Sequence, residues 1–89
     1  MNATITLQQF EAIDGLNSQI ICMGDFMSLP IDQARHFVRL TNRLFDACID
    51  AVGYDSARSF PSAEECAATI ITGCLSGTIE TVDLMECAA

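Results

Sequence analysis

The chain has no lysine and no tryptophan, and only 4 of its 89 residues are cations, all of them arginine. Against them stand 12 Asp and Glu residues, so the formal net charge is -8. So acidic a surface argues against direct binding of nucleic acid or of an anionic membrane. Charged residues of either sign make up only 18% of the chain, below the usual share of about 25%. With so few charges to cover a monomer, we expect a homodimer or a higher oligomer.

Patterns typical of enzymes and metal sites are also missing. His36 is the only histidine, the 5 cysteines form no C-x-x-C pair, and there is no Gly-rich phosphate loop. We therefore expect no cofactor, no metal and no catalytic activity. We interpret the cysteines as reduced thiols that fill the core. An enzyme that uses His36 is a further alternative, because a nucleophile and a histidine can meet through folding.

The chain also lacks signals for export or membrane insertion. Its first residues show neither the basic nor the apolar region of a signal peptide. No apolar run approaches the roughly 18 residues that a membrane span needs. We therefore expect a cytoplasmic protein without a membrane partner. A chain of this length forms a single core, so residues 1–89 are predicted to be one helical domain.

Apolar residues recur every three or four positions along most of the chain, a spacing typical of amphipathic helices. The pattern predicts helices over about residues 7–26, 30–52 and 63–87, with a loop at residues 54–61. Thr6 with Gln9, and Ser62 with Glu65, have the spacing of capping boxes at two of the helix starts. The predicted fold is therefore all-α, a small three-helix bundle.

The second of these helices is the central one. Its apolar residues fill an arc of about 200° at 100° per residue, whereas a helix that packs on one side needs only about 100°. Neighbouring elements on two sides are therefore expected. Pro30 suits the first turn of this helix and Gly53 its end.

The third helical segment includes a stretch of strand-like composition. Residues 69–73 are rich in Thr and Ile, which favour strands. A break near residues 76–78 is an alternative to one continuous helix. We favour the helix over residues 69–75, because the apolar spacing there is three or four rather than two.

Three of the four cations, Arg35, Arg39 and Arg43, recur every four residues and so share one face of the second helix. Asp32 precedes Arg35 by three residues and Asp46 follows Arg43 by three, so ion pairs within the helix are one interpretation. The other is contact with an acidic partner or with phosphate groups, which guanidinium groups bind through paired hydrogen bonds. Arg39 is the farthest in sequence from an aspartate and the most available to a partner.

The polar side of the third helix carries only small uncharged residues between Glu65 and Glu80. Small residues let two backbones approach closely, so we interpret this strip as a self-association surface. Its members are Thr69, Thr72, Gly73, Ser76 and Gly77. The alternative is that the strip packs inside the same monomer or marks a break in the helix.

Several flexible or aromatic apolar residues have two possible uses. Met23, Phe26, Met27 and Phe60 either fill the core or form an adaptable contact surface. We favour the core for most of them.

The 12 carboxylates also raise the possibility that the protein mimics nucleic acid. A mimic needs an unbroken array of exposed negative charge. Here aspartates alternate with the arginines, and the third helix has a gap in its charge, so this alternative is not the leading one.

Our leading hypothesis is a non-enzymatic regulator or inhibitor that binds a protein and covers its functional surface. The short, acidic, lysine-free profile is similar to that of phage-encoded inhibitors of host defence, including anti-CRISPR proteins; the similarity lies in composition and covers no motif. A basic, nucleic-acid-handling target suits the charge, because opposite fields speed encounter. The candidate partner-binding residues are Arg35, Arg39, Arg43, Glu80, Asp83 and Glu86. The alternative is an oligomeric binder that sequesters a nucleotide or another anion at the arginines.

Overall fold

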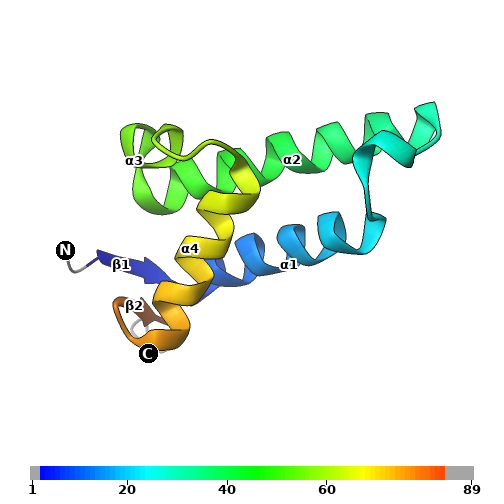
Figure 1. Ribbon diagram of the computed structural model, residues 1–89. Coiled ribbons are helices and arrows are strands. Elements are labelled where there is room, and N and C mark those ends of the chain that lie inside the picture. Colours follow the sequence, from blue (N-terminus) through cyan, green and yellow to red (C-terminus); the bar gives the residue numbers. More distant parts are fainter. Residues whose placement is uncertain (1–2, 84–89) are drawn as a thin grey trace.

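Four α-helices, a short 3-10 turn and two strands make up the computed structural model, which describes residues 3–83 (Figure 1). In chain order they are β1 (Ala3–Thr6), α1 (Leu7–Met23), η1 (Phe26–Ser28), α2 (Ile31–Val52), α3 (Tyr54–Arg58), α4 (Ala63–Ser76) and β2 (Ile79–Val82). The predicted all-α bundle is confirmed. Helix α2 is its centre, because it packs against α1, α3 and α4.

Helix α1 begins with the predicted capping box. The Gln9 backbone N–H donates to Thr6 Oγ1 at 3.0 Å, and the Thr6 N–H donates to Gln9 Oε1 at 2.8 Å. Gln9 Nε2 also donates to Asp50 Oδ2 at 3.1 Å, which ties the start of α1 to the last turn of α2. The helix ends at Met23 rather than near residue 26, because Gly24 leaves the helical conformation with a φ of 80°.

The segment predicted as a loop before the third helix contains α3. Asp55 in its first turn and Arg58 in its last turn complement the helix dipole. The Arg58 guanidinium carbon lies 5.7 Å from the centroid of the Tyr54 ring. Ala57 is buried, so this short helix closes one end of the core.

Helix α4 confirms that residues 69–75 are helical rather than a strand. It starts at Ala63, where the Glu65 N–H donates to Ser62 Oγ at 3.2 Å. It ends at Ser76, so the predicted extension toward residue 87 is wrong.

The end of α4 has a simple physical cause. Gly77 adopts the left-handed conformation (φ 86°, ψ 1°), which ends a helix at little cost for glycine. The spacing of Ile79 and Val82 suggested one helical face, whereas residues three apart on a strand point to opposite faces. Residues 84–87 of the predicted helix lie outside the described residues.

Strands β1 and β2 form a two-stranded parallel sheet, in which Ala3 lies opposite Ile79 and Thr6 lies opposite Val82. Ile5 is only 2% exposed and anchors β1 in the core. The sheet therefore holds the start of α1 beside the end of α4 (Figure 1).

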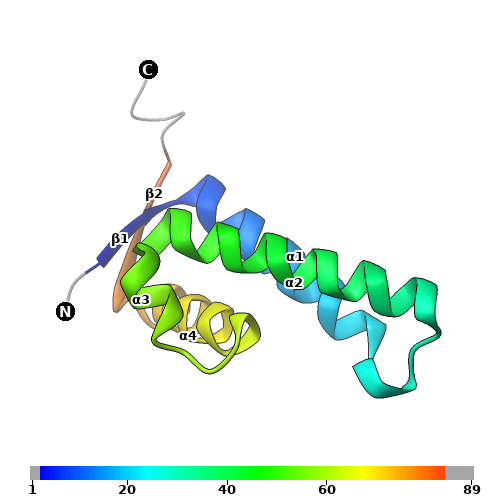
Figure 2. The same cartoon turned by 90° about the horizontal axis from the view of Figure 1, so that it is seen from above.

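Helix α4 covers only the part of the α1–α2 hairpin that is nearer the sheet (Figures 1 and 2). Thr41 Oγ1 lies 3.3 Å from Glu64 Oε1 in the first turn of α4, and this hydrogen bond marks where the cover begins. The turn end of the hairpin projects beyond it and makes the molecule elongated, at 45 × 28 × 21 Å. We call the projecting part, residues 21–39, the arm.

Candidate functional site

Helix α2 exposes all three of the arginines that the sequence singles out, but they do not share one site. Arg35 and Arg39 line an apolar hollow on the arm, and Arg43 does not. Four residues advance an α-helix by about 40° beyond a full turn. The row of arginines therefore winds around α2, and Arg43 is the one farthest from Val38 in the hollow.

The hollow on the arm has apolar walls and a volume of about 370 Å³. Its lining residues are Phe26, Ile31, Ala34, Arg35, Val38 and Arg39. Ile31 is 67% exposed and Val38 46% exposed. Large apolar side chains that gather in this way on a protein surface are typical of contact sites.

A second hollow, of about 310 Å³, continues the first toward α4. The two share Phe26 and Val38, and the second is also lined by Phe37 and, at its inner end, by Glu64. The rings of Phe26 and Phe37 lie 5.1 Å apart at an angle of 44°, a favourable aromatic arrangement. The two hollows adjoin at Phe26 and Val38, and we call them together, from Ile31 to Glu64, the arm groove.

The wide apolar arc of α2 explains why the arm groove exists. Near the sheet, α1 and α4 pack on two sides of α2, as the sequence predicts. On the arm, α4 is absent (Figure 2), so the part of the arc that carries Ile31 and Val38 faces outward. Met27 is 84% exposed and Phe26 40%, which corrects the prediction that they fill the core. Met23 and Phe60 do pack against the core, as predicted.

The arginines of α2 form no ion pair with a carboxylate within residues 3–83. Arg35 therefore does not pair with Asp32, and Arg43 does not pair with Asp46. Exposed ion pairs contribute little even where they form. The guanidinium groups of Arg35 and Arg39 remain able to receive an anionic group at the edge of the arm groove.

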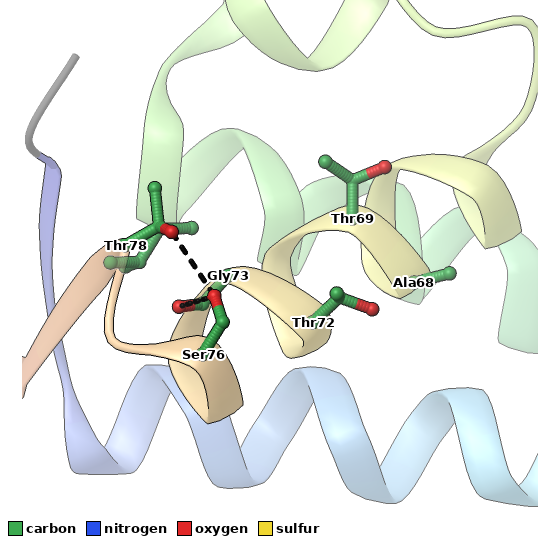
Figure 3. Close-up of a pocket in the computed structure, with 7 residues that line it drawn as sticks. Ala68, Thr69, Thr72, Gly73, Ser76 and Thr78 are labelled. Carbon is green, nitrogen blue, oxygen red and sulfur yellow. Dashed lines mark hydrogen bonds between the residues drawn. The ribbon is translucent and has the colours of Figure 1, made fainter.

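The strip on α4 that was predicted for self-association forms a different hollow (Figure 3). We call it the α4 groove; its volume is about 540 Å³, and it is lined by Ala68, Thr69, Thr72, Gly73, Ser76, Thr78 and Ile79. Ser76 Oγ donates to the Gly73 carbonyl at 3.2 Å and lies 3.1 Å from Thr78 Oγ1. Thr69 and Thr72 are exposed.

The two glycines of that strip have roles within the monomer. A Cβ atom on Gly73 would lie 2.6 Å from Ile79 Cδ1, so the glycine makes room for β2 to cross α4. Gly77 holds the left-handed turn that ends α4. The sequence left this intramolecular role open as the alternative. The role of Thr69, Thr72, Gly73, Ser76 and Gly77 in self-association stays a prediction.

Two of the candidate acidic residues, Glu80 and Asp83, lie on or just after β2, at the other end of the molecule from the arm (Figures 1 and 2). Glu80 is exposed on β2. Asp83 follows β2, and its Oδ1 accepts a hydrogen bond from Gln8 Nε2 at 3.3 Å. Glu86 lies outside the described residues. The structure therefore does not bring these acids to the arginines.

The prediction that the cysteines fill the core is confirmed for Cys48 and Cys66, and Cys74 packs against the core, but the prediction is wrong for Cys22, which is exposed. Cys87 lies outside the described residues. Cys48 and Cys66 are both 0% exposed. Burial, with a smaller effect of the neighbouring Cys66, raises the pKa of the Cys48 thiol to about 12. Burial also raises the pKa of Cys66. Neither thiol is suited to act as a nucleophile, because the thiolate is the reactive form.

His36 lies on the opposite side of α2 from the arm groove. It lines a hollow of about 370 Å³ together with Cys22, which is exposed. No hydrogen bond joins the two side chains in the part of the chain that the structure describes. This arrangement supplies no activated nucleophile.

The sequence interpretation did not single out Ile31 or Val38 as exposed, and it favoured the core over a contact surface for most of the group that contains Phe26. The sequence feature that indicates the exposure of Ile31 and Val38 is the width of the apolar arc of α2, which exceeds what one neighbouring helix covers.

No group of three or more His, Cys, Asp or Glu within residues 3–83 is placed to hold a metal ion. No helix in the same range has the length and apolar character needed to cross a membrane. The chain matches no protein-family model, and neither the curated proteins nor the solved structures include a match.

Proposed function

We propose that the protein is a non-enzymatic regulator or inhibitor that binds another protein through the arm groove. The observation that carries this proposal is the exposure of Ile31, Val38 and Phe26 in one apolar groove with two arginines at its edge. Apolar surface with arginine at the rim is the composition of protein contact sites, where arginine and aromatic residues contribute most of the affinity.

The elongated shape suits a steric mode of action. The arm projects from the body that carries the sheet (Figures 1 and 2), so it reaches into a partner while the rest of the molecule stays outside. The bulk of the bound protein then covers the partner's surface around the contact. Inhibition by this route needs no catalytic group.

The uneven charge of the chain also indicates which charge the partner's surface should carry. The chain carries a net -8, and two of its four cations border the arm groove. A partner whose overall surface is basic, such as a nucleic-acid-handling protein, is attracted by the acidic surface. The contact itself would be made in the arm groove, whose lining includes two arginines, Arg35 and Arg39, and one carboxylate, Glu64.

Affinity capture from an extract of the source organism tests this function. Val38→Asp places a charge in the arm groove and should lower the amount of captured partner by about tenfold or more. Leu75→Asp is the matched control, because Leu75 is 78% exposed on α4 and lines neither hollow of the arm groove. Equal capture by wild type and Val38→Asp would show that the arm groove is not the binding site.

Self-association is a separate part of the proposal. The exposed Thr69 and Thr72 line the α4 groove, where a second copy would approach closely. Thr72→Arg adds bulk and charge there and should convert an oligomer to a monomer in sedimentation velocity. A wild-type protein that is already a monomer, or an oligomer that Thr72→Arg leaves intact, contradicts this surface.

The alternative function, sequestration of a nucleotide or another anion, has one supporting observation. Arg35 and Arg39 line a hollow and have no described carboxylate partner. A ligand at 100 times its dissociation constant raises the free energy of unfolding by about 2.7 kcal/mol, which a melting curve detects. A shift with nucleotides that Arg39→Ala abolishes would favour this alternative over protein binding.

A further inference from the structure

The arm lacks the third layer that the rest of the bundle has. Helix α2 has 22 residues and α4 has 14. At 1.5 Å per residue they are about 33 Å and about 21 Å long, so α4 leaves about 12 Å or more of α2 uncovered. The arm groove occupies this uncovered part and meets α4 at Glu64.

The shape of the arm groove corresponds to the side of a helix. It follows α2 from Ile31 to Asn42, which is about 17 Å or three helical turns. One helix laid along it would contact Ile31, Val38 and Phe26 through apolar residues at the i, i+3 and i+7 positions. Apolar grooves between helices bind amphipathic helices in this way.

The charges at the groove select the kind of helix. Arg35 and Arg39 are one turn apart at its edge and have no carboxylate partner within residues 3–83. Carboxylates one turn apart on a docked helix would meet them, and guanidinium groups hold carboxylates through paired hydrogen bonds. Resting on the function proposed above, we infer that the arm groove binds an acidic amphipathic helix of the partner, which completes the third layer of the arm.

A second copy of this chain fits the arm groove less well. A two-fold contact places the same patch of each copy against the other. It would bring Arg35 and Arg39 of both copies into one interface, where like charges repel. Among the described residues that line the groove, Glu64 is the only carboxylate, so each copy would bring two arginines and one carboxylate to the contact.

Two matched peptides test the inference on the full 89-residue chain. The first is an Ala-rich, end-capped peptide of about 16 residues, or four helical turns, with leucine at the i, i+3 and i+7 positions and flanking glutamates. The second carries lysine in place of each glutamate. Binding is measured by fluorescence anisotropy at low salt.

We expect the glutamate peptide to bind at least about tenfold more tightly than the lysine peptide. The sign of this difference is informative. The net charge of -8 attracts the lysine peptide over long range, so a preference for glutamate requires local contact with the arginines. Equal or tighter binding of the lysine peptide, or no saturation by the glutamate peptide at about 1 mM, overturns the inference.

Single charge reversals locate the contact. Arg39→Glu should abolish or invert the preference for the glutamate peptide. Arg43→Glu changes the net charge by the same amount but lies outside the arm groove, so it should keep the preference. The same loss in both variants overturns the inference. All of these side chains are exposed, and melting curves check that each variant is folded.

Two further results test the identity of the molecule in the arm groove separately from the function proposed above. A wild-type dimer that Val38→Asp converts to a monomer would show that a second copy fills the arm groove, and this overturns the acidic helix. Failure of the peptides while Val38→Asp still loses the captured partner also overturns the acidic helix, but it leaves protein binding through the groove intact.

Discussion

The arm and the half of the molecule that carries the sheet are built from the same two helices. Apolar residues are buried in the half near the sheet and exposed on the arm. On α2, Leu44 and Cys48 near the sheet are 0% exposed, whereas Ile31 and Val38 on the arm are 67% and 46% exposed. The difference does not come from the local sequence of α2, which is apolar over a wide arc throughout. It comes from the position of α4, whose first turn meets α2 at Thr41 and which runs from there toward the sheet, so that it provides a third layer for only one half (Figure 1).

The comparison separates stability from binding. Folding free energy comes mainly from buried apolar contacts, which are concentrated in the half near the sheet. The arm has fewer such contacts and keeps apolar surface available. Substitutions in the two halves should therefore differ in what they change.

The largest effect is expected from a matched pair of isoleucines. Ile13→Ala, at a side chain that is 0% exposed, should lower the free energy of unfolding by about 2–5 kcal/mol, because it leaves a cavity. Ile31→Ala, at 67% exposure, should change it by less than about 1 kcal/mol. Urea denaturation measures both. Similar losses would show that the arm contributes to stability as much as the core.

Alkaline pH probes the buried thiol of Cys48 in the core. The pKa of Cys48 is raised from 9.0 to about 12 in the folded protein, so the unfolded chain loses this proton first. The stabilisation is fully present below about pH 9 and is lost as pH rises toward 12. One thiol accounts for at most about 1.4 kcal/mol per pH unit over that range. Urea midpoints from about pH 8 to 10.5 should fall more steeply for wild type than for Cys48→Ala.

Two glycines within helices provide a smaller contrast. Gly73→Ala places a Cβ 2.6 Å from Ile79 Cδ1, and the clash should outweigh the helix propensity gain of about 1 kcal/mol, for a net loss of roughly 1 kcal/mol. Gly15→Ala meets nothing within 4 Å and should stabilise by about 0.5–1 kcal/mol. Shortening Ile79 to Ala should relieve the loss at Gly73, and a double-mutant cycle measures this coupling. Purely additive effects would mean that the two residues do not interact.

The smallest effect is expected at the arginines. Arg39→Gln should change the free energy of unfolding by less than about 0.5 kcal/mol, because Arg39 is exposed and has no ion pair within residues 3–83. Thermal unfolding at low and high salt measures it. A loss above about 1 kcal/mol at low salt would show that Arg39 supports the fold instead of awaiting a partner.

The sequence predicted the elements that local chemistry controls. The capping box at Thr6 and the stop at Gly53 are read from residue types within a few positions. The wide apolar arc of α2 also correctly indicated a central helix. The predicted packing of neighbouring helices on two sides of α2 holds only along the part of α2 that α4 covers.

The parts that were missed depend on contacts distant in sequence. Strand β2 has a short apolar spacing that fits a helix equally well, and only its pairing with β1 decides between them. The exposure of Val38 likewise depends on where α4 begins and on how it crosses α2, which no pattern near Val38 reveals. Of the candidate site, the sequence supplied Arg35 and Arg39, and the structure added the apolar groove beside them.

The parallel pairing of β1 with β2 also sets an order for biosynthesis. Strand β1 is among the first described segments to leave the ribosome, and its partner strand is the last. Until Ile79 and the rest of β2 have been synthesised, the edge of β1 has no strand to pair with. The helices can form during translation, but the fold closes only when nearly the whole described chain has been made.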